Sequence, residues 1–181
     1  MMRNLMEKYY KELCPNIKKE LSLKNIYQVP CVKKIVVSSG VGRYKEDKEI
    51  IKKFSDDFSL FCGQKPKINL SKKAVSAFKL RIGQPVGLTA TLRGQRMYDF
   101  IERLTKVGMP RIRDFKGLKR KGFDKMGNHS FGVEEHTIMP EIKYDNVNQS
   151  FGFQVNIYIN TSDAKTSELL LKNLGFPFEK S

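Results

Sequence analysis

Apolar side chains recur with two different periods along this chain, and each period predicts a different kind of element. Seven of them recur at helical spacing near the N-terminus, which predicts a helix over residues 3–21. Pro15 lies within this range and should kink or divide the helix, because proline has no amide N–H to donate. The seven residues are Leu5, Met6, Tyr9, Tyr10, Leu13, Ile17 and Leu21.

The segment up to residue 70 should form a strand, a helix and a second strand. The β-branched run from Val32 to Ser39 predicts the first strand, which ends at the turn Gly40-Val41-Gly42. Acidic residues then open a helix over about residues 46–62, with its apolar side chains on one side. A turn and a short strand through Ile68 and Leu70 complete this part.

Two later segments alternate between apolar and polar side chains, which is the pattern of a strand with one buried face. They cover residues 86–93 and 151–159. A helical stripe over residues 97–107 follows the first of them. Residues 111–130 are rich in glycine and in cations, which predicts a loop.

Strands and helices therefore alternate, and at least two of the strands have a polar face. A last helix should begin at a Ser162 or Asp163 cap and end at Gly175. We expect a single α+β domain over residues 1–181, a two-layer sandwich with helices on one face of a mostly antiparallel sheet. The basic residues 71–84 have no clear period and should protrude as a long loop. The uncovered sheet face then meets either solvent or a ligand.

Charge is concentrated in the middle third of the chain. The formal net charge is +15, and residues 65–125 hold 17 Lys and Arg side chains against four acidic ones. The first 64 residues carry a net charge of +5, and the last 56 carry −3. Such a concentration indicates a surface that meets a polyanion.

Composition excludes several other classes of protein. No apolar run approaches the roughly 18 residues that span a bilayer, and charged residues interrupt the N-terminal segment where a signal peptide would be apolar. We therefore expect no membrane partner. Cys14, Cys31 and Cys62 are odd in number and widely spaced, which indicates reduced thiols in a cytosol-like compartment.

Two cationic segments have a binding interpretation and a structural one. Phe78, beside Lys79 and Arg81, would stack on an unpaired base, or it would anchor the loop in the protein's own core. Residues 93–96, Arg-Gly-Gln-Arg, join a strand to a helix. The backbone N–H groups at the helix start and the two guanidinium groups would bind a phosphate there. Alternatively, these arginines pair with Asp99 or Glu102 one turn later. Spacing alone does not decide either case.

Catalytic, cofactor and metal sites are not expected. The segment Gly40-Val41-Gly42 completes neither common phosphate-loop spacing, and the two histidines, seven positions apart, have no cysteine nearby. Four acidic residues in the acidic last third are interpreted as solvated surface. These are Glu134, Glu135, Glu141 and Asp145.

Two alternatives to a nucleic-acid-binding protein stay open. The first is an enzyme that acts on nucleic acid, with acidic residues of the basic region as metal ligands. The second is a protein of anionic membrane surfaces, which the lack of a strongly basic amphipathic helix disfavours. The acidic residues available to the first are Asp99, Glu102, Asp114 and Asp124.

Several stretches, in order and across nearly the whole length, resemble one family: the bacterial-type large-subunit ribosomal protein number five. That family binds 5S rRNA in the central protuberance of a ribosome that is cytoplasmic or organellar. The stretches are YQVPCVKKIVVSSGVG (27–42), GQKPKINLSKKAVSAFKLRIGQPVGLTATLRGQRMYDFIERL (63–104), PRIRDFKGL (110–118), FDKMGNHSFGVEEHTIMPEIKYDNV (123–147) and FPFEK (176–180).

The resemblance implies a concave antiparallel sheet that docks on 5S rRNA, and a loop, residues 72–83, that touches the T-loop region of peptidyl-site tRNA. It also implies contacts with 23S-type rRNA, neighbouring 5S-associated proteins and a protein of the small-subunit head. The implied 5S rRNA residues are Lys34, Ser38, Gln64, Phe78, Thr91 and Arg93. The implied tRNA-binding residues are Lys72, Lys73, Lys79 and Arg81.

The chain departs from the family pattern at several of these points. Ser38-Ser39 stands where the family usually has Asn-Met, and Ala77 stands where the loop usually has glycine. Loss of that glycine restricts positive φ angles and should stiffen or reshape the loop tip. Lys125-Met126 replaces a usual Gly-Arg, and Phe151 replaces an arginine before the last strand.

Overall fold

The computed structural model describes residues 5–142, 149–161 and 163–179, and its centre is a five-stranded sheet with strand order β2-β3-β1-β5-β4. Every neighbouring pair is antiparallel. The strands are β1 (Val32–Gly40), β2 (Lys67–Leu70), β3 (Pro85–Leu92), β4 (His129–Val133) and β5 (Phe153–Ile159). The helices are α1 (Leu5–Lys8), α2 (Cys14–Glu20), α3 (Lys48–Cys62), α4 (Gly94–Arg103) and α5 (Ala164–Asn173).

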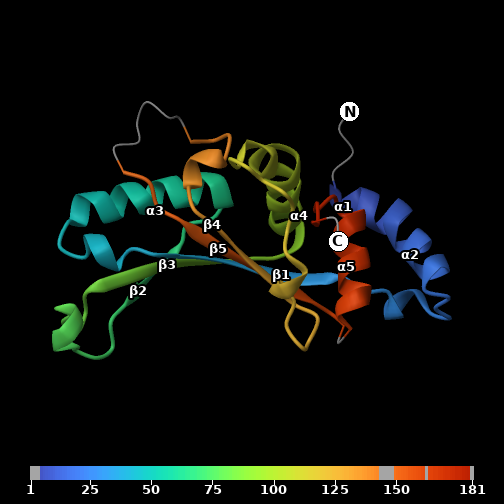
Figure 1. Ribbon diagram of the computed structural model, residues 1–181, viewed down its shortest axis with the longest axis horizontal. Helices are drawn as coiled ribbons and strands as arrows, with labels where there is room; N and C mark the ends of the chain where they lie inside the picture. Colours follow the sequence, from blue (N-terminus) through green and yellow to red (C-terminus); the bar gives the residue numbers. More distant parts are fainter. Residues whose placement is uncertain (1–4, 143–148, 162, 180–181) are drawn as a thin grey trace.

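Helices α3 and α4 lie over one face of this sheet, and no helix of the described residues crosses the opposite face (Figure 1). Alternate strand residues such as Ile35, Leu88 and Ile157 point to the covered face and are fully buried. Their neighbours along each strand are partly or fully exposed. The expected α+β sandwich with an open, antiparallel sheet is confirmed.

The N-terminal helix is divided, as Pro15 predicts. A π-helical stretch, Tyr9–Leu13, separates α1 from α2, and Pro15 lies at the start of α2, where it has no N–H to donate to the preceding turn. A second π-helical stretch, Leu104–Gly108, extends α4. Side-chain packing anchors the first stretch to the sheet: the Tyr9 hydroxyl donates to the carbonyl oxygen of Pro30 over 2.7 Å.

The prediction of a loop over residues 111–130 is wrong at its C-terminal end, because β4 begins at His129. The inward positions of this strand are His129, Phe131 and Val133, so a histidine interrupts the short apolar alternation that would have marked it as a strand. His129 is nevertheless fully buried. Strand β5 also begins later than expected, at Phe153, while Phe151 packs outside the strand. Asp163 caps α5, and Ser162 lies outside the described residues.

Both histidines lie in aromatic surroundings beside the sheet. The His136 ring stacks on Phe151 with ring centroids 4.0 Å apart, and its Nδ1 accepts the amide N–H of Phe151. The His129 ring lies edge-on to Phe123, with centroids 4.5 Å apart. Burial lowers the pKa of each imidazole below its ordinary value. For His136, the nearby Asp57 carboxylate opposes this shift without cancelling it.

Stability should therefore fall as the pH decreases from 7 to 5.5. The unfolded chain takes up protons near pH 6.5, whereas the folded chain resists protonation until its lowered pKa values are reached, so acid favours unfolding. Urea unfolding at pH 7.0, 6.2 and 5.5 measures this loss. The double variant His129→Phe/His136→Phe should have a flatter profile over that interval, and an unchanged slope would contradict the assignment.

The three cysteines are free thiols, with Cys14 and Cys62 buried, as the spacing predicts. Burial raises the pKa of the Cys14 and Cys31 thiols, which keeps them protonated at neutral pH. Among the described helices, none is both long and apolar enough to cross a bilayer.

Candidate nucleic-acid interface

The uncovered side of the sheet, here called the open face, brings together residues from the three central strands. Pairing places Val36 between Thr91 and Asn156, and Ser38 between Thr89 and Gln154. Lys34 pairs with Tyr158. The open face is defined by Lys34, Val36, Ser38, Thr89, Thr91, Gln154, Asn156 and Tyr158. Three predicted binding residues, Lys34, Ser38 and Thr91, therefore share one surface.

Arg93 and Gln64 lie at the end of the sheet where β3 leads into α4. Arg93 has extended backbone angles and continues the alternation of Thr89 and Thr91, so it belongs beside Lys34 on the open face. Gln64 follows the left-handed Gly63 that ends α3 and precedes edge strand β2. Extending the register of β2 and β3 places Gln64 near this same end.

Hydrogen-bonding groups without charge occupy the middle of the open face. The Asn69 amide, next to it on β2, donates to the Thr89 hydroxyl over 2.6 Å, and the Asn156 amide donates to the Val36 carbonyl over 3.4 Å. Cations lie toward the ends, and none of the described strand residues that point outward here is acidic. The face therefore suits a ligand that combines ribose and base hydrogen-bonding groups with negative charge.

Phe78 is 76% exposed, so the interpretation of this residue as a core anchor is wrong. It lies in the 71–84 loop between β2 and β3, which projects beyond the sheet on the left of Figure 1. The other aromatic residues of the basic region behave differently, since Tyr98 is buried and Phe115 and Phe123 pack against the core. An exposed phenylalanine among cations is a surface for stacking or for apolar contact. The loop cations Lys72, Lys73, Lys79 and Arg81 are all exposed.

Hydrogen bonds fix the shape of this loop. Val75 and Leu80 exchange both backbone hydrogen bonds, and Ser71 bonds Gln84 at the loop base. At the tip, the Lys45 ammonium donates to the carbonyl oxygens of Phe78 and Lys79, each over 2.6 Å. Lys45 comes from the turn before α3, so it holds the tip from outside the loop.

The backbone conformation at the tip explains how the chain tolerates Ala77. Ala77 lies within a 3-10 turn, Ser76–Phe78, which any residue adopts. The left-handed residue is Lys79, with φ of 49°, two positions later. The Lys45 hydrogen bonds lie next to this strained residue and stabilise it.

Replacing Lys45 by methionine should loosen the loop tip without unfolding the domain. The variant keeps the alkyl stem but leaves two carbonyl groups without their charged donor, which costs about 1–3 kcal/mol of local stability. Amide hydrogen exchange at Lys79 and Leu80 should accelerate roughly tenfold or more, while exchange in β1 and β5 stays slow. Lys48→Met, an exposed neighbour, is the control, and equal exchange in both variants would contradict the tether.

The loop tip and the Lys34 end of the open face are separate surfaces. Strand β3 leads from the loop at Pro85 to Leu92 and Arg93, a strand of eight residues. At about 3.3 Å per residue, it extends for roughly 25 Å. Phe78 therefore lies with the four loop cations, whereas Lys34, Thr91 and Arg93 lie at the far end. One nucleotide cannot contact both groups.

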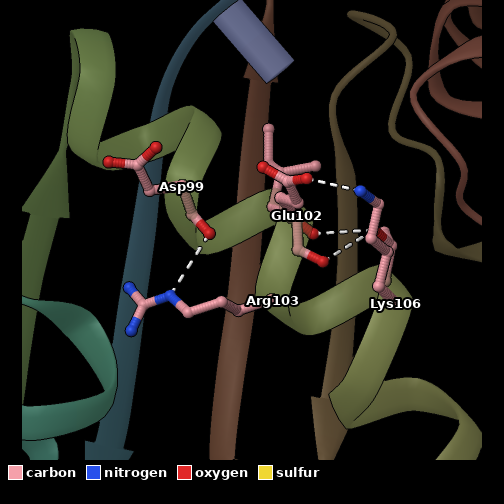
Figure 2. Close-up of polar contacts among 6 residues, drawn as sticks. Asp99, Glu102, Arg103 and Lys106 are labelled. Atoms are coloured by element: carbon pink, nitrogen blue, oxygen red, sulfur yellow. Dashed lines mark hydrogen bonds and ion pairs between the residues drawn. The ribbon is translucent and has the colours of Figure 1, made fainter. Parts of the chain in front are cut away.

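Arg93 and Arg96 do not pair with the acidic residues of α4, so that alternative is wrong. The Asp99 carboxylate accepts from the Gln95 amide over 2.8 Å, and Glu102 pairs with Lys106. Figure 2 shows the second pair on one side of the helix, with Arg103 turned away from it and donating to the Asp99 backbone carbonyl. Both arginines are exposed and available to a ligand.

Three carboxylates of the basic region, those of Asp99, Glu102 and Asp124, bond to their own neighbours. Asp124 accepts from the Met126 and Asn128 amides and from the Asn128 side chain, and these hydrogen bonds hold its pKa below the usual range. Within the described residues, no three metal-ligating side chains converge. Glu141 is not a solvated surface residue as expected, because it pairs with Arg103 at 23% side-chain exposure. Asp145 lies outside the described residues.

Sequence reasoning missed two residues of these surfaces. Tyr158 was placed on the polar face by its alternation, but nothing in the pattern indicated that it lies across from Lys34. Lys45 gave no signal at all, because its partners lie 33 and 34 positions away. Conversely, the dense triplet Lys119-Arg120-Lys121 is less available than its sequence indicates, since Arg120 pairs with Glu168 over 3.1 Å.

Two family models match the chain. One, described as the ribosomal L5P family C-terminus, matches residues 85–178, and the other, described as ribosomal protein L5, matches residues 25–81. Similar relatives are named large ribosomal subunit protein uL5. The relative from Helicobacter hepaticus is 44% identical over 176 residues, covering 97% of both chains. That from Pelagibacter ubique is 43% identical over 180 residues, covering 99% of this chain and 98% of its own.

Proposed function

This chain belongs to the ribosomal protein L5 family, and from this premise we propose how it holds RNA. As a family member it is a structural constituent of the large ribosomal subunit, found in cytoplasmic ribosomes of the bacterial type, and it is not an enzyme. Its partners are accordingly rRNA and other ribosomal proteins. The open question is which surface meets which RNA.

The open face is the surface for 5S rRNA. Its neutral hydrogen-bonding side chains, with Lys34 and Arg93 toward one end, suit unpaired nucleotides of a folded RNA better than they suit a uniform phosphate backbone. Ser38, Thr91 and Gln64 add hydrogen-bonding groups on or beside this face. The observation that carries the proposal is the grouping of Lys34, Ser38 and Thr91 on one uncovered surface.

The 71–84 loop is the surface for peptidyl-site tRNA. It presents four exposed cations around an exposed aromatic ring, and hydrogen bonds from outside and within the loop hold it in shape. Such a surface binds phosphates with its cations and a sugar or base with Phe78. Because Phe78 lies roughly a strand length from Lys34, it serves 5S rRNA only where that RNA also reaches the loop.

Further contacts follow from the family. We assign 23S-type rRNA, the neighbouring 5S-associated proteins and a protein of the small-subunit head as partners in the assembled ribosome. Exposed cations outside the two proposed surfaces, such as Lys119, Lys121 and Arg111, are available to them.

Filter binding of 5S rRNA across a salt series tests the proposal. Neutralising several phosphates should make binding fall steeply with salt, by about 10²–10⁴-fold between low and moderate salt, by analogy with DNA contacts. Lys34→Ala and Thr91→Ala should weaken binding without unfolding the domain. Lys33→Ala, which removes the same charge one residue away, is the matched control. Affinity that is flat in salt, or equal for an unrelated hairpin, would sink the proposal.

A further inference from the structure

An aromatic ring stands on the open face at Tyr158. It is 38% exposed, and the register places it directly opposite Lys34 on β1. Among the residues that define the open face, the others are small, polar or basic, apart from Val36. A large aromatic side chain is therefore partly exposed among mostly polar neighbours.

Lys34 holds this ring in place. Its ammonium nitrogen lies over the Tyr158 ring, 4.3 Å from the centroid, which is within the range of a cation–π contact. In a cross-strand pair of this kind, each side chain restricts the rotamers of the other. The ammonium therefore covers one side of the ring, while Tyr158 keeps 38% of its surface exposed.

The surroundings favour a nucleobase over an apolar protein partner. Asn156 and Ser130 lie beside the ring along the register. An apolar partner would bury their polar groups without hydrogen bonds, which is unfavourable, whereas a nucleotide can bond to them. No acidic side chain of the described strands stands on this side to repel phosphate. Lys34, next to the ring, and Arg93, at the same end, supply the charge that a nucleotide's phosphate requires.

We propose that Tyr158 is a stacking platform for one unpaired base of the bound RNA, with the Lys34 ammonium meeting a phosphate beside that base. The proposal rests on the open face being the RNA surface, and it narrows the ligand class. A base can stack on a tyrosine ring only after it has left its own helix. The Lys34 end of the face therefore selects loop or bulge nucleotides and discriminates against continuous duplex.

Tyr158→Trp provides a direct test, because the chain has no tryptophan and the variant has a single indole. On titration with 5S rRNA, a base stacked on the indole should quench its fluorescence at least twofold and shield it from acrylamide. A fully paired duplex of equal length should leave the fluorescence nearly unchanged. Tyr27→Trp, at a tyrosine that is 88% exposed outside the sheet, is the control and should not be quenched.

Affinities give a second readout. Loss of one stacked base corresponds to roughly a 5- to 150-fold weaker affinity, so Tyr158→Leu should bind 5S rRNA about tenfold more weakly, while Tyr158→Phe should bind within about twofold of the parent. Normal binding by Tyr158→Leu, or an unquenched indole in an RNA complex of normal affinity, would overturn the platform and leave the open-face proposal intact. Failure of the folded parent protein to bind 5S rRNA at all would instead overturn both.

Discussion

Replacing the four exposed cations of the 71–84 loop by alanine should remove most of the binding to a tRNA T-arm hairpin and leave 5S rRNA affinity within about threefold. The four residues are Lys72, Lys73, Lys79 and Arg81. Each phosphate contact contributes about 0.7 to the logarithmic salt slope for single-stranded nucleic acid, so the slope should fall by roughly three. At low salt, the hairpin affinity should fall on the order of a hundredfold.

A matched variant separates this effect from the loss of net charge. Replacing Lys19, Lys24, Lys52 and Lys53, which are exposed far from the loop in sequence, removes the same charge. Hairpin binding by that variant should fall only a few-fold, through the weaker overall field. Equal losses in the two variants, or equal losses of hairpin and 5S rRNA binding in the loop variant, would refute the division of the protein into two RNA surfaces.

The largest effect on stability is expected at Arg103. Its guanidinium donates to the Asp99 carbonyl (Figure 2). It also pairs with Glu141 and lies beside Gly63 at the end of α3, so one side chain joins three segments. Arg103→Met would leave the Glu141 carboxylate, whose Oε2 is already buried without a partner among the described residues, with no countercharge. We expect the free energy of unfolding to fall by about 2–4 kcal/mol in urea denaturation.

Two comparisons identify the cause of that loss. Lys106→Met breaks an ion pair on the same helix whose lysine is 66% exposed, and it should cost less than about 0.5 kcal/mol. The double variant Arg103→Met/Glu141→Met removes both charges and should recover much of the stability, because no unpaired carboxylate is left. If the double variant is less stable than Arg103→Met alone, the loss of stability in Arg103→Met comes from lost packing and not from the unpaired Glu141 carboxylate.

The periodicity of the sequence predicts most elements because most of them bury one regular face. Strand β3 and helix α3 follow their apolar patterns closely, since Leu88, Ala90 and Leu92 or Phe54, Phe58 and Phe61 fill the space between two layers. Strand β4 was not predicted because its first inward position holds His129, a polar residue that is buried among Phe123, Phe131 and Phe178. The spacing of apolar residues cannot show a polar side chain that is buried only by the tertiary structure.

For the candidate site too, local sequence patterns predict some residues and not others. Thr91 was placed on a polar face by local alternation, and the structure keeps it there. The exposure of Phe78 was undecided, because it depends on whether the loop folds back onto the core, which sequence spacing does not determine. The Lys45 contact and the Lys34–Tyr158 pair join segments that only the three-dimensional fold brings together. Their discovery required coordinates.

Strand β3 has one more consequence for the assembled particle. Hydrogen bonds to β1 and β2 on its two sides make it a stiff bar between the loop tip and the Lys34 end of the sheet. If RNA binds at both ends as proposed, a shift of the RNA at one end would be transmitted along β3 to the RNA at the other. Under the proposed assignment, the departure of tRNA from the loop would displace 5S rRNA through β3. The occupancy of the peptidyl site would then be coupled to the position of 5S rRNA in the central protuberance.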